Sequence, residues 1–347
     1  MRFGVVLVHY YTPGLAASAV ASLVEDAAAS GVELEIARVD NGSTAEGREL
    51  LGHLDGVRLL EPGENLGYAG AFNFGVRQLP TVDAVAVMNP DVRVMPGCLG
   101  ALADALSDGA GVVGPRFWWD RPGGFVLPPT EERGRRHSVR RFLSLRTGAG
   151  PARRAWRRHA RRHWRATEPV ESLSLSGALL AIELGAWRRV GPFDDAYRLY
   201  FEESDWLERA RKAGVRGRFV PGSEARHGYA QSTVKEPRAA RWFSESHHRF
   251  RRRHYGRAFT AALEGAAGLW PQKVTAAAPG RPTAAEIGAA EWLELSASAV
   301  GYPAAGMHLA RQVRRDPGLE LPLPEGAYWL RGLRGDRELW AYGPAVA

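Results

Sequence analysis

The chain has 347 residues, of which 45% are hydrophobic and 24% are charged, and its formal net charge is +8 at pH 7. These proportions exclude wholesale disorder and collagen-like repeats. The single cysteine, Cys98, excludes an internal disulfide and a thiolate metal cluster within one chain. No run of about 18 apolar residues is present, and the short apolar run after Met1 is not typical of a signal peptide. We therefore expect a cytoplasmic protein.

In the first third of the chain, apolar runs alternate with stretches that have the composition of helices. Strands are expected at residues 3–9, 33–39, 57–60, 84–88 and 111–117, and helices at 14–30, 68–78 and 96–107. This alternation predicts an α/β fold with a mixed, mainly parallel sheet flanked by helices. In such a sheet the ligand binds beyond the carboxyl ends of the strands. Polar residues follow two of the expected strands there, namely Asp40, Asn41, Asn89 and Asp91.

The positive charge is concentrated in residues 131–165, which contain 13 arginines and two glutamates, so the rest of the chain carries a net charge of −3. A second structured block is expected at 172–232. A basic helix at 241–256, an amphipathic helix at 284–298 and a small β element at 327–342 follow. We therefore predict a first domain over 1–237 that includes the arginine-rich insert, and a helical accessory region over 238–347.

Three short motifs carry side chains that are suited to chemistry. Asp40 follows a strand, where a carboxylate can accept a hydrogen bond from a nucleobase or a ribose, although for this motif taken alone a plain turn is the better explanation. Asp91 stands at the end of a buried strand and offers the hard oxygen ligand that Mg²⁺ or Mn²⁺ prefers, and here too a turn is the simpler explanation. Glu202, Glu203 and Asp205 stand between aromatic residues at a helix start, where one of them can act as a general base.

Seven segments, in this order, resemble glycosyltransferase family 2, the nucleotide-sugar-dependent enzymes of the A-type fold. They are Val5–Gly14, Val39–Ser43, Glu64–Val76, Met88–Val92, Leu175–Ile182, Val190–Tyr197 and Tyr200–Gly214. Met88–Val92 is similar to the family's Asp-x-Asp metal motif in an Asn-x-Asp form. The family has Glu-Asp where this chain has Glu202-Glu203, so this departure puts the position of the base in doubt.

The resemblance implies a role for each candidate residue. Glu203 is expected to be the catalytic base, with Asp205 as the alternative, and Asp91 and His227 are expected to bind the metal, Mg²⁺ or Mn²⁺. The nucleotide-sugar donor is expected to contact Tyr10, Asp40, Asn41, Asn65, Gly67, Asn73 and Asn89.

The expected reaction is an inverting transfer of a sugar from a nucleotide-diphosphate donor to a hydroxyl group. A rhamnosyl-type transfer to a cell-surface glycan or a lipid-linked intermediate is the leading hypothesis. A secondary-metabolite acceptor and a non-catalytic nucleotide-sugar or membrane-binding module are the alternatives. A nucleotidyltransferase is disfavoured because residues 9–13 lack a glycine-rich phosphate loop with a basic residue.

The arginine-rich insert has arginine pairs spaced by four residues, at 153–154, 157–158 and 161–162, so they share one helical face. Such a face suits an anionic membrane surface or a phosphate-bearing acceptor, but a solvated insert is equally consistent with the composition. No nucleic-acid motif accompanies it, so no nucleic-acid partner is expected. We expect a cytoplasmic protein that associates with the inner face of the membrane through 131–165, and a homodimer stays open.

Overall fold

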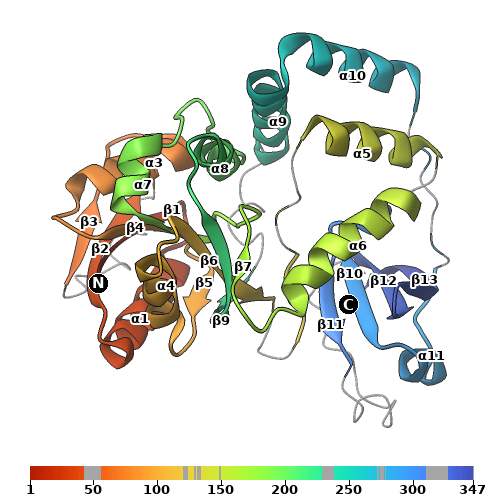
Figure 1. The fold of residues 1–347 in the computed structure, drawn as a ribbon, viewed down its shortest axis with the longest axis horizontal. Coiled ribbons are helices and arrows are strands. Elements are labelled where there is room, and N and C mark those ends of the chain that lie inside the picture. Colours follow the sequence, from red (N-terminus) through yellow and green to blue (C-terminus); the bar gives the residue numbers. More distant parts are fainter. Residues whose placement is uncertain are drawn as a thin grey trace. The chain divides into compact units, whose positions relative to one another are not determined.

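The computed structural model describes residues 1–42, 56–119, 124–128, 130, 134–147, 150–228, 238–271, 273, 277, 279–309 and 327–346. The chain forms two compact units (Figure 1). The first contains residues 1–117 and 167–257, and the second contains residues 118–166 and 258–347. The arginine-rich segment therefore belongs with the C-terminal part of the chain, and the helix before residue 257 belongs with the first unit. This division differs from the expected boundary after residue 237.

A nine-stranded mixed sheet forms the centre of the first unit, with the order β3-β2-β1-β4-β8-β6-β9-β5 and with β7 paired to β9. Its strands are β1 (Arg2–His9), β2 (Glu33–Asp40), β3 (Val57–Leu60), β4 (Ala84–Met88), β5 (Val92–Val94), β6 (Val112–Trp118), β7 (Val170–Glu171), β8 (Leu179–Glu183) and β9 (Gly217–His227). Strands β3, β2, β1 and β4 are parallel, whereas β8 pairs antiparallel with β4 and with β6. The predicted α/β fold class is confirmed.

Helices flank this sheet: α1 (Pro13–Ser30), α3 (Gly67–Gln78), α4 (Cys98–Ser107), α7 (Leu184–Val190), α8 (Glu202–Lys212) and α9 (Ala239–Tyr255). All five residues of β4 are buried, as are seven of the eight in β1. Because both strands lie inside the parallel half, their apolar runs are continuous rather than alternating. The α9 helix confirms the basic helix expected at 241–256.

The second unit is built on a four-stranded antiparallel sheet with the order β11-β10-β12-β13. The strands are β10 (Trp292–Ser296), β11 (Ala305–His308), β12 (Ala327–Arg334) and β13 (Arg337–Val346). They are accompanied by α5 (Arg135–Thr147), α6 (Gly150–Trp164), α10 (Arg257–Leu269), which begins at the last residue of the first unit, and α11 (Ala284–Ala289). The β element expected at 327–342 is confirmed as β12 and β13.

The helix expected over 284–298 is wrong in its second half. A capping box between Thr283 and Glu286 starts α11, which ends at Ala289. The chain then continues as β10, whose five residues are all buried. Tertiary packing outweighs the helical pattern here, since the rings of Trp292 and Trp164 stack at 5.7 Å.

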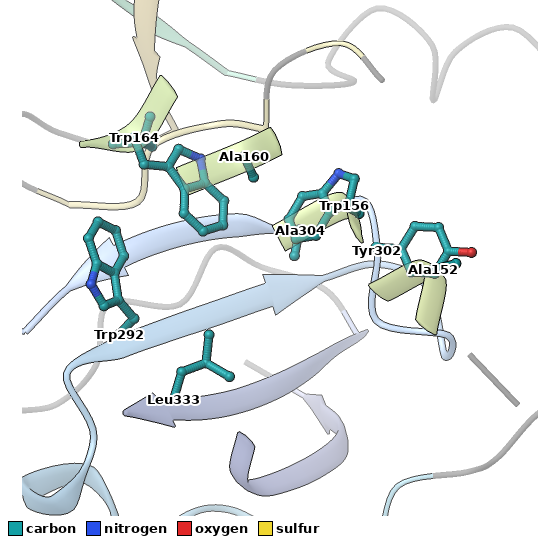
Figure 2. Close-up of a cluster of buried hydrophobic side chains, with 9 residues drawn as sticks. Ala152, Trp156, Ala160, Trp164, Trp292, Tyr302, Ala304 and Leu333 are labelled. Atoms are coloured by element: carbon teal, nitrogen blue, oxygen red, sulfur yellow. The ribbon is translucent and has the colours of Figure 1, made fainter. Parts of the chain in front are cut away.

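A cluster of aromatic and small side chains joins α6 to this sheet, as Figure 2 shows. It includes Trp156, Trp164, Trp292 and Tyr302, with Ala160 of α6 fully buried between them. Aromatic rings supply most of the apolar area of this small core. The segment expected to be an insert is thus part of the hydrophobic core of the second unit.

Arginines on the same side of α6 are also buried. Arg157 donates two hydrogen bonds of 2.7 Å to the carboxylate of Glu294, which is completely buried, and one of 2.8 Å to Glu338. Arg161 pairs with Asp336. Only the second member of each arginine pair (Arg154, Arg158 and Arg162) is exposed. Neither of the two expectations for the paired arginines, an anion-binding face or a solvated insert, holds for the first member of each pair, because acidic residues of the C-terminal sheet neutralise these arginines.

Candidate active site

One side of the candidate site is formed by the carboxyl ends of two parallel strands, β1 and β2. His9 at the end of β1 is in register with Asp40 at the end of β2. The backbone N–H of Asn41 donates to the carbonyl of His9 at 3.0 Å, which holds the two ends together. Burial lowers the pKa of His9 to about 4, so its imidazole is neutral at pH 7. As predicted, Asp40 and Asn41 lie at the edge of the sheet where a parallel sheet binds its ligand.

The turn after Asp40 brings Tyr10 into the same place. The carboxylate of Asp40 accepts a 3.2 Å hydrogen bond from the N–H of Gly42. A Cβ atom on Gly42 would lie 3.6 Å from the ring of Tyr10. Tyr10 and Asp40 are therefore neighbours at this edge, as expected. Ser43, the last residue of this motif, lies outside the described residues.

The Asn41 side chain ties a second loop to these strand ends. Its carbonyl oxygen accepts from the N–H of Leu66 at 2.9 Å, and its amide nitrogen donates to Asn65 and to the carbonyl of Gly67, each at 3.2 Å. The residues predicted to line the donor cleft, Asn41, Asn65 and Gly67, thus form one hydrogen-bonded group. The side-chain amide of Asn41 therefore uses its hydrogen bonds to position this loop.

Gly67 is required by the backbone at the start of α3. Its φ is +73°, and a Cβ atom there would lie 2.8 Å from the carbonyl oxygen of Arg198. The next residue, Tyr68, donates its N–H to that same oxygen at 2.9 Å. The loop after β3 is thereby joined to the segment that leads into α8.

Asn73 does not line the donor cleft, contrary to expectation. Its amide nitrogen donates to the carbonyl of Phe193 at 2.9 Å and to Asp195, and its oxygen accepts from the N–H of Phe193 at 3.1 Å. A buried amide with these partners has little capacity for a ligand. Asn73 instead attaches α3 to residues 193–195.

Tyr68 is a site residue that the sequence analysis did not single out. Its hydroxyl donates to Asn89 Oδ1 at 2.6 Å and lies 3.3 Å from the carbonyl oxygen of Gly177. Asn89 follows β4, so Tyr68 connects the donor-side loop to the strand end that bears Asp91. The sequence signal that could have identified Tyr68 is its position directly after Gly67, at the start of the expected helix 68–78.

Asp91 and His227 are 136 positions apart in the sequence but adjacent in the fold. Antiparallel pairing of β5 with β9 sets Val92 opposite His227. The backbone N–H of Gly228 donates to the carbonyl of Asp91 at 3.0 Å. His227 Nε2 consequently lies 3.4 Å from Asp91 Oδ1. The two residues predicted to bind a metal are brought together, whereas Tyr229, which follows in the same motif, lies outside the described residues.

The ligand atoms of Asp91 and His227 fit a hard divalent cation whose remaining ligands do not come from the protein. Asp91 Oδ1 is buried and accepts no hydrogen bond from the protein. Among the described residues, no group of three or more His, Cys, Asp and Glu side chains has the arrangement of a metal cage. Mg²⁺ typically takes one or two protein carboxylates and completes its shell with water and phosphate oxygens. One carboxylate and one imidazole are compatible with that mode of binding.

The first two acids of α8 face the same region. Burial raises the pKa of the Tyr68 hydroxyl well above its usual value, and the negative charges of Glu202, Glu203 and Asp91 raise it further. A Cβ atom on Gly177 would lie 3.0 Å from Glu203 Cγ, so Glu203 packs directly on that glycine. Three carboxylates close enough to act on one phenol make this region electronegative, which favours a bound cation.

Asp205 has a different role from the one considered in the sequence analysis. It is fully buried and accepts hydrogen bonds from His254 Nε2 at 2.7 Å and Arg209 Nε at 2.9 Å. Burial alone would raise the pKa of Asp205, but these hydrogen bonds and the charges of Arg209 and Arg253 outweigh burial and lower that pKa. An enclosed carboxylate with these partners is poorly placed to take a proton from an acceptor, which argues against the alternative of Asp205 as the base.

Comparison with known proteins identifies the family of the chain. The model of Glycosyl transferase family 2 matches residues 5–160. The N-acetylglucosaminyl-diphospho-decaprenol L-rhamnosyltransferase of Mycobacterium tuberculosis is 36% identical over 220 residues, which cover 57% of this chain and 67% of that protein. The low-salt glycan biosynthesis hexosyltransferase Agl10 of Haloferax volcanii is 26% identical over 190 residues, or 54% of this chain and 56% of that protein. The chain belongs to glycosyltransferase family 2 and is a glycosyltransferase.

Two solved structures show weaker similarity. GalNAc-T7 with UDP, GalNAc and Mn²⁺ is 15% identical with a TM-score of 0.47, and the match covers 85% of this chain and 60% of that one. S. aureus TarS is 13% identical with a TM-score of 0.44, and the match covers 72% of this chain and 64% of that one.

Proposed function

We propose that this glycosyltransferase moves a sugar from a nucleotide-diphosphate donor to a hydroxyl group of a lipid-linked glycan intermediate, with inversion at the anomeric carbon. The observation that carries the proposal is the meeting of Asp91, His227, Tyr68 and Glu203 next to the strand ends that bear Asp40 and Asn41. The relative from Mycobacterium tuberculosis, by its name, acts on a diphospho-decaprenol acceptor. A rhamnosyl-type transfer in cell-wall or polysaccharide synthesis is therefore the reaction we favour.

The donor nucleotide is proposed to bind along the carboxyl edge of the parallel strands. Asp40 accepts a hydrogen bond from the base or the ribose, and Tyr10 offers an aromatic face beside it. Asn65 and Gly67 support the loop over the diphosphate, where the glycine permits close approach of the backbone. Asn89, oriented by the Tyr68 hydroxyl, faces the sugar end of the donor.

Asp91, with His227 beside it, is proposed to hold Mg²⁺ or Mn²⁺. A divalent cation bound there supplies positive charge to the leaving nucleoside diphosphate. The Oδ1 atom of Asp91, which is buried beside His227 Nε2 and accepts no hydrogen bond, supports this assignment, because such a carboxylate oxygen is costly to bury unless a ligand occupies it. The protein's part is to keep that oxygen turned toward the site through the β5–β9 pairing.

Glu203 is proposed to take the proton of the acceptor hydroxyl as that oxygen attacks the anomeric carbon. A new glycosidic C–O bond forms, the bond from the anomeric carbon to the diphosphate oxygen breaks, and the nucleoside diphosphate leaves with the electron pair. One displacement from the opposite face inverts the configuration. Ser204 donates a 2.8 Å hydrogen bond to Glu203 Oε1, which restricts the orientation of the carboxylate.

The test is a screen of nucleotide-diphosphate sugars with the purified protein, Mn²⁺ and a polyprenyl diphospho-sugar acceptor. Transfer from one donor, with release of its nucleoside diphosphate, is the expected result. Slow release without acceptor is expected as well, since water can replace the hydroxyl. A protein that raises its melting temperature with a donor but releases no nucleoside diphosphate under any condition would be a binding module, contrary to the proposal.

A further inference from the structure

The helices α5 and α10 are the least buried helices of the second unit. Of the thirteen residues of α5 only Ser144 and Arg146 are buried, and of the thirteen of α10 only Thr260 is. An ordinary surface helix buries an apolar stripe against its own core. The exposed apolar residues of these two helices are therefore not accounted for by packing within the described part of this unit.

The two helices nevertheless pack on each other. Arg135 near the start of α5 lies over the ring of Phe259 near the start of α10. At the other end, the rings of Phe142 and Trp270 meet edge to face at 6.3 Å, and Arg146 donates to the carbonyl of Trp270. The helices thus run parallel, as Figure 1 shows, and form a defined element.

The solvent side of this element combines apolar and cationic residues. On α5, Arg136, Val139, Arg140 and Leu143 are exposed at helical spacing. At the end of α10, Leu269 is 89% exposed, and Trp270 beside it is 43% exposed. We call these six residues the α5–α10 surface. Exposed apolar residues grouped with arginines are unusual for a surface that meets only water.

The charge of this surface has one sign. The α5 helix contains five arginines and no acidic residue. No described residue forms an ion pair with Arg136 or Arg140. This differs from α6, where Arg157 and Arg161 are neutralised by Glu294 and Asp336. Arginines without partners remain available to an external anion.

We propose that the α5–α10 surface docks on the surface of an anionic lipid bilayer, with Leu143, Leu269 and Trp270 entering the interface and Arg136 and Arg140 lying among the lipid phosphates. Charge complementarity selects the bilayer as the occupant, because Arg136 and Arg140, exposed beside apolar side chains, match a sheet of anionic headgroups. This inference rests on the proposed function, because a protein docked on a bilayer is brought to a lipid-linked acceptor. Within the segment 131–165 that was expected to meet the membrane, the contact is thus assigned to α5, together with the end of α10, and not to α6.

The experiment measures binding of the full chain to vesicles by co-sedimentation. Vesicles of phosphatidylcholine alone are compared with vesicles that contain phosphatidylglycerol, at low and at high salt. Binding only to the anionic vesicles is expected, and it should fall as salt rises because the Debye length shortens to about 8 Å at physiological ionic strength. Equal binding to both kinds of vesicle, or none to either, would overturn the proposal.

Two matched double variants locate the contact. Arg136→Ala with Arg140→Ala should weaken binding about fivefold per arginine, or ~30-fold together. Arg154→Ala with Arg158→Ala removes the same charge from the exposed side of α6 and should bind as the natural protein does. Equal losses in both variants would show attraction by overall charge rather than by this surface. Leu143→Ser with Leu269→Ser should weaken binding at every salt concentration.

Two further readouts separate this proposal from its rivals. If the leucine variant changes the sedimentation mass of the protein in solution and leaves vesicle binding intact, the surface is a contact between two copies of the chain. Donor hydrolysis without acceptor should be unchanged in all three variants, since none of these residues lies in the candidate active site. A protein that binds vesicles as described yet releases no nucleoside diphosphate would contradict the proposed function and leave the docking surface standing.

Discussion

The imidazole Nε2 of His254 lies 2.7 Å from the carboxylate Oδ1 of Asp205, and both side chains are buried. This contact joins α9 to α8, immediately after the two acids that face the candidate active site. Two cations, Arg209 and Arg253, lie 2.9 Å and 3.3 Å from the same carboxylate. Of the three acids at the start of α8, Asp205 therefore has a structural role. Its charge stabilises the helix that carries Glu202 and Glu203.

Asp205→Asn should reduce stability more than it alters chemistry. The substitution keeps the volume of the side chain but removes the counter-charge of Arg209, whereas Arg253 keeps its ion pair with Asp194. We expect a loss of roughly 3 kcal/mol in the free energy of unfolding, at the low end for a broken buried pair because Arg253 is partly exposed. Urea unfolding measures it. An unchanged unfolding midpoint combined with lost turnover would return Asp205 to the role of the base.

Asp91→Ala should abolish transfer and leave the fold intact. The buried Oδ1 atom of Asp91 has no hydrogen bond to lose, so the unfolding midpoint should change little. Transfer by the natural protein should stop in excess EDTA and return with Mn²⁺. Full activity in excess EDTA would contradict the assignment of Asp91 and His227 to a metal.

Gly177→Ala tests the placement of Glu203. The new methyl group would lie 3.0 to 3.1 Å from Cγ and Cβ of Glu203, closer than such contacts normally are, so the acid must shift. A shift of a few tenths of an ångström should lower kcat about tenfold while the KM for the donor stays the same. Steady-state kinetics checks this. A variant with normal kcat would show that Glu203 need not hold this position.

Arg157→Leu tests whether α6 is structural. It leaves Glu294 buried without its partner, which should cost about 3–5 kcal/mol in the second unit. The matched control is Arg158→Leu, one position along and exposed, which should change stability by less than ~0.5 kcal/mol. Thermal unfolding compares the two. Equal losses of stability in the two variants would mean that the buried pair of Arg157 and Glu294 does not stabilise the second unit.

The fold of the first unit and most of its candidate site could be predicted, because both depend on local patterns. Buried strands that end in polar turns placed Asp40, Asn41 and Asn89 at one edge of the sheet. The adjacency of Asp91 and His227 was predictable only through the family resemblance, since it depends on the pairing of β5 with β9. The role of Asp205 was not predictable, because its partner His254 belongs to a helix that follows 49 positions later.

The structure of the second unit was harder to predict, again because it depends on contacts between residues far apart in the sequence. Composition alone made the arginines of α6 resemble a solvated face, and the acidic residues that neutralise them lie more than 130 positions away. The strand β10 has an alanine-rich helix before it and one glutamate, Glu294, within it, so local propensity favoured a longer helix. Only the packing of Trp292 on Trp164 and the pairing of Glu294 with Arg157 decide its structure.

The most direct test of the central claim is the rate of sugar transfer by Glu203→Gln. This substitution keeps the shape of the side chain and removes its basicity. We expect kcat to fall ~10²–10⁴-fold, with the unfolding midpoint and the dissociation constant of the donor unchanged. Transfer by Glu203→Gln within a few-fold of the natural rate, with the loss falling instead on Glu202→Gln, would contradict it.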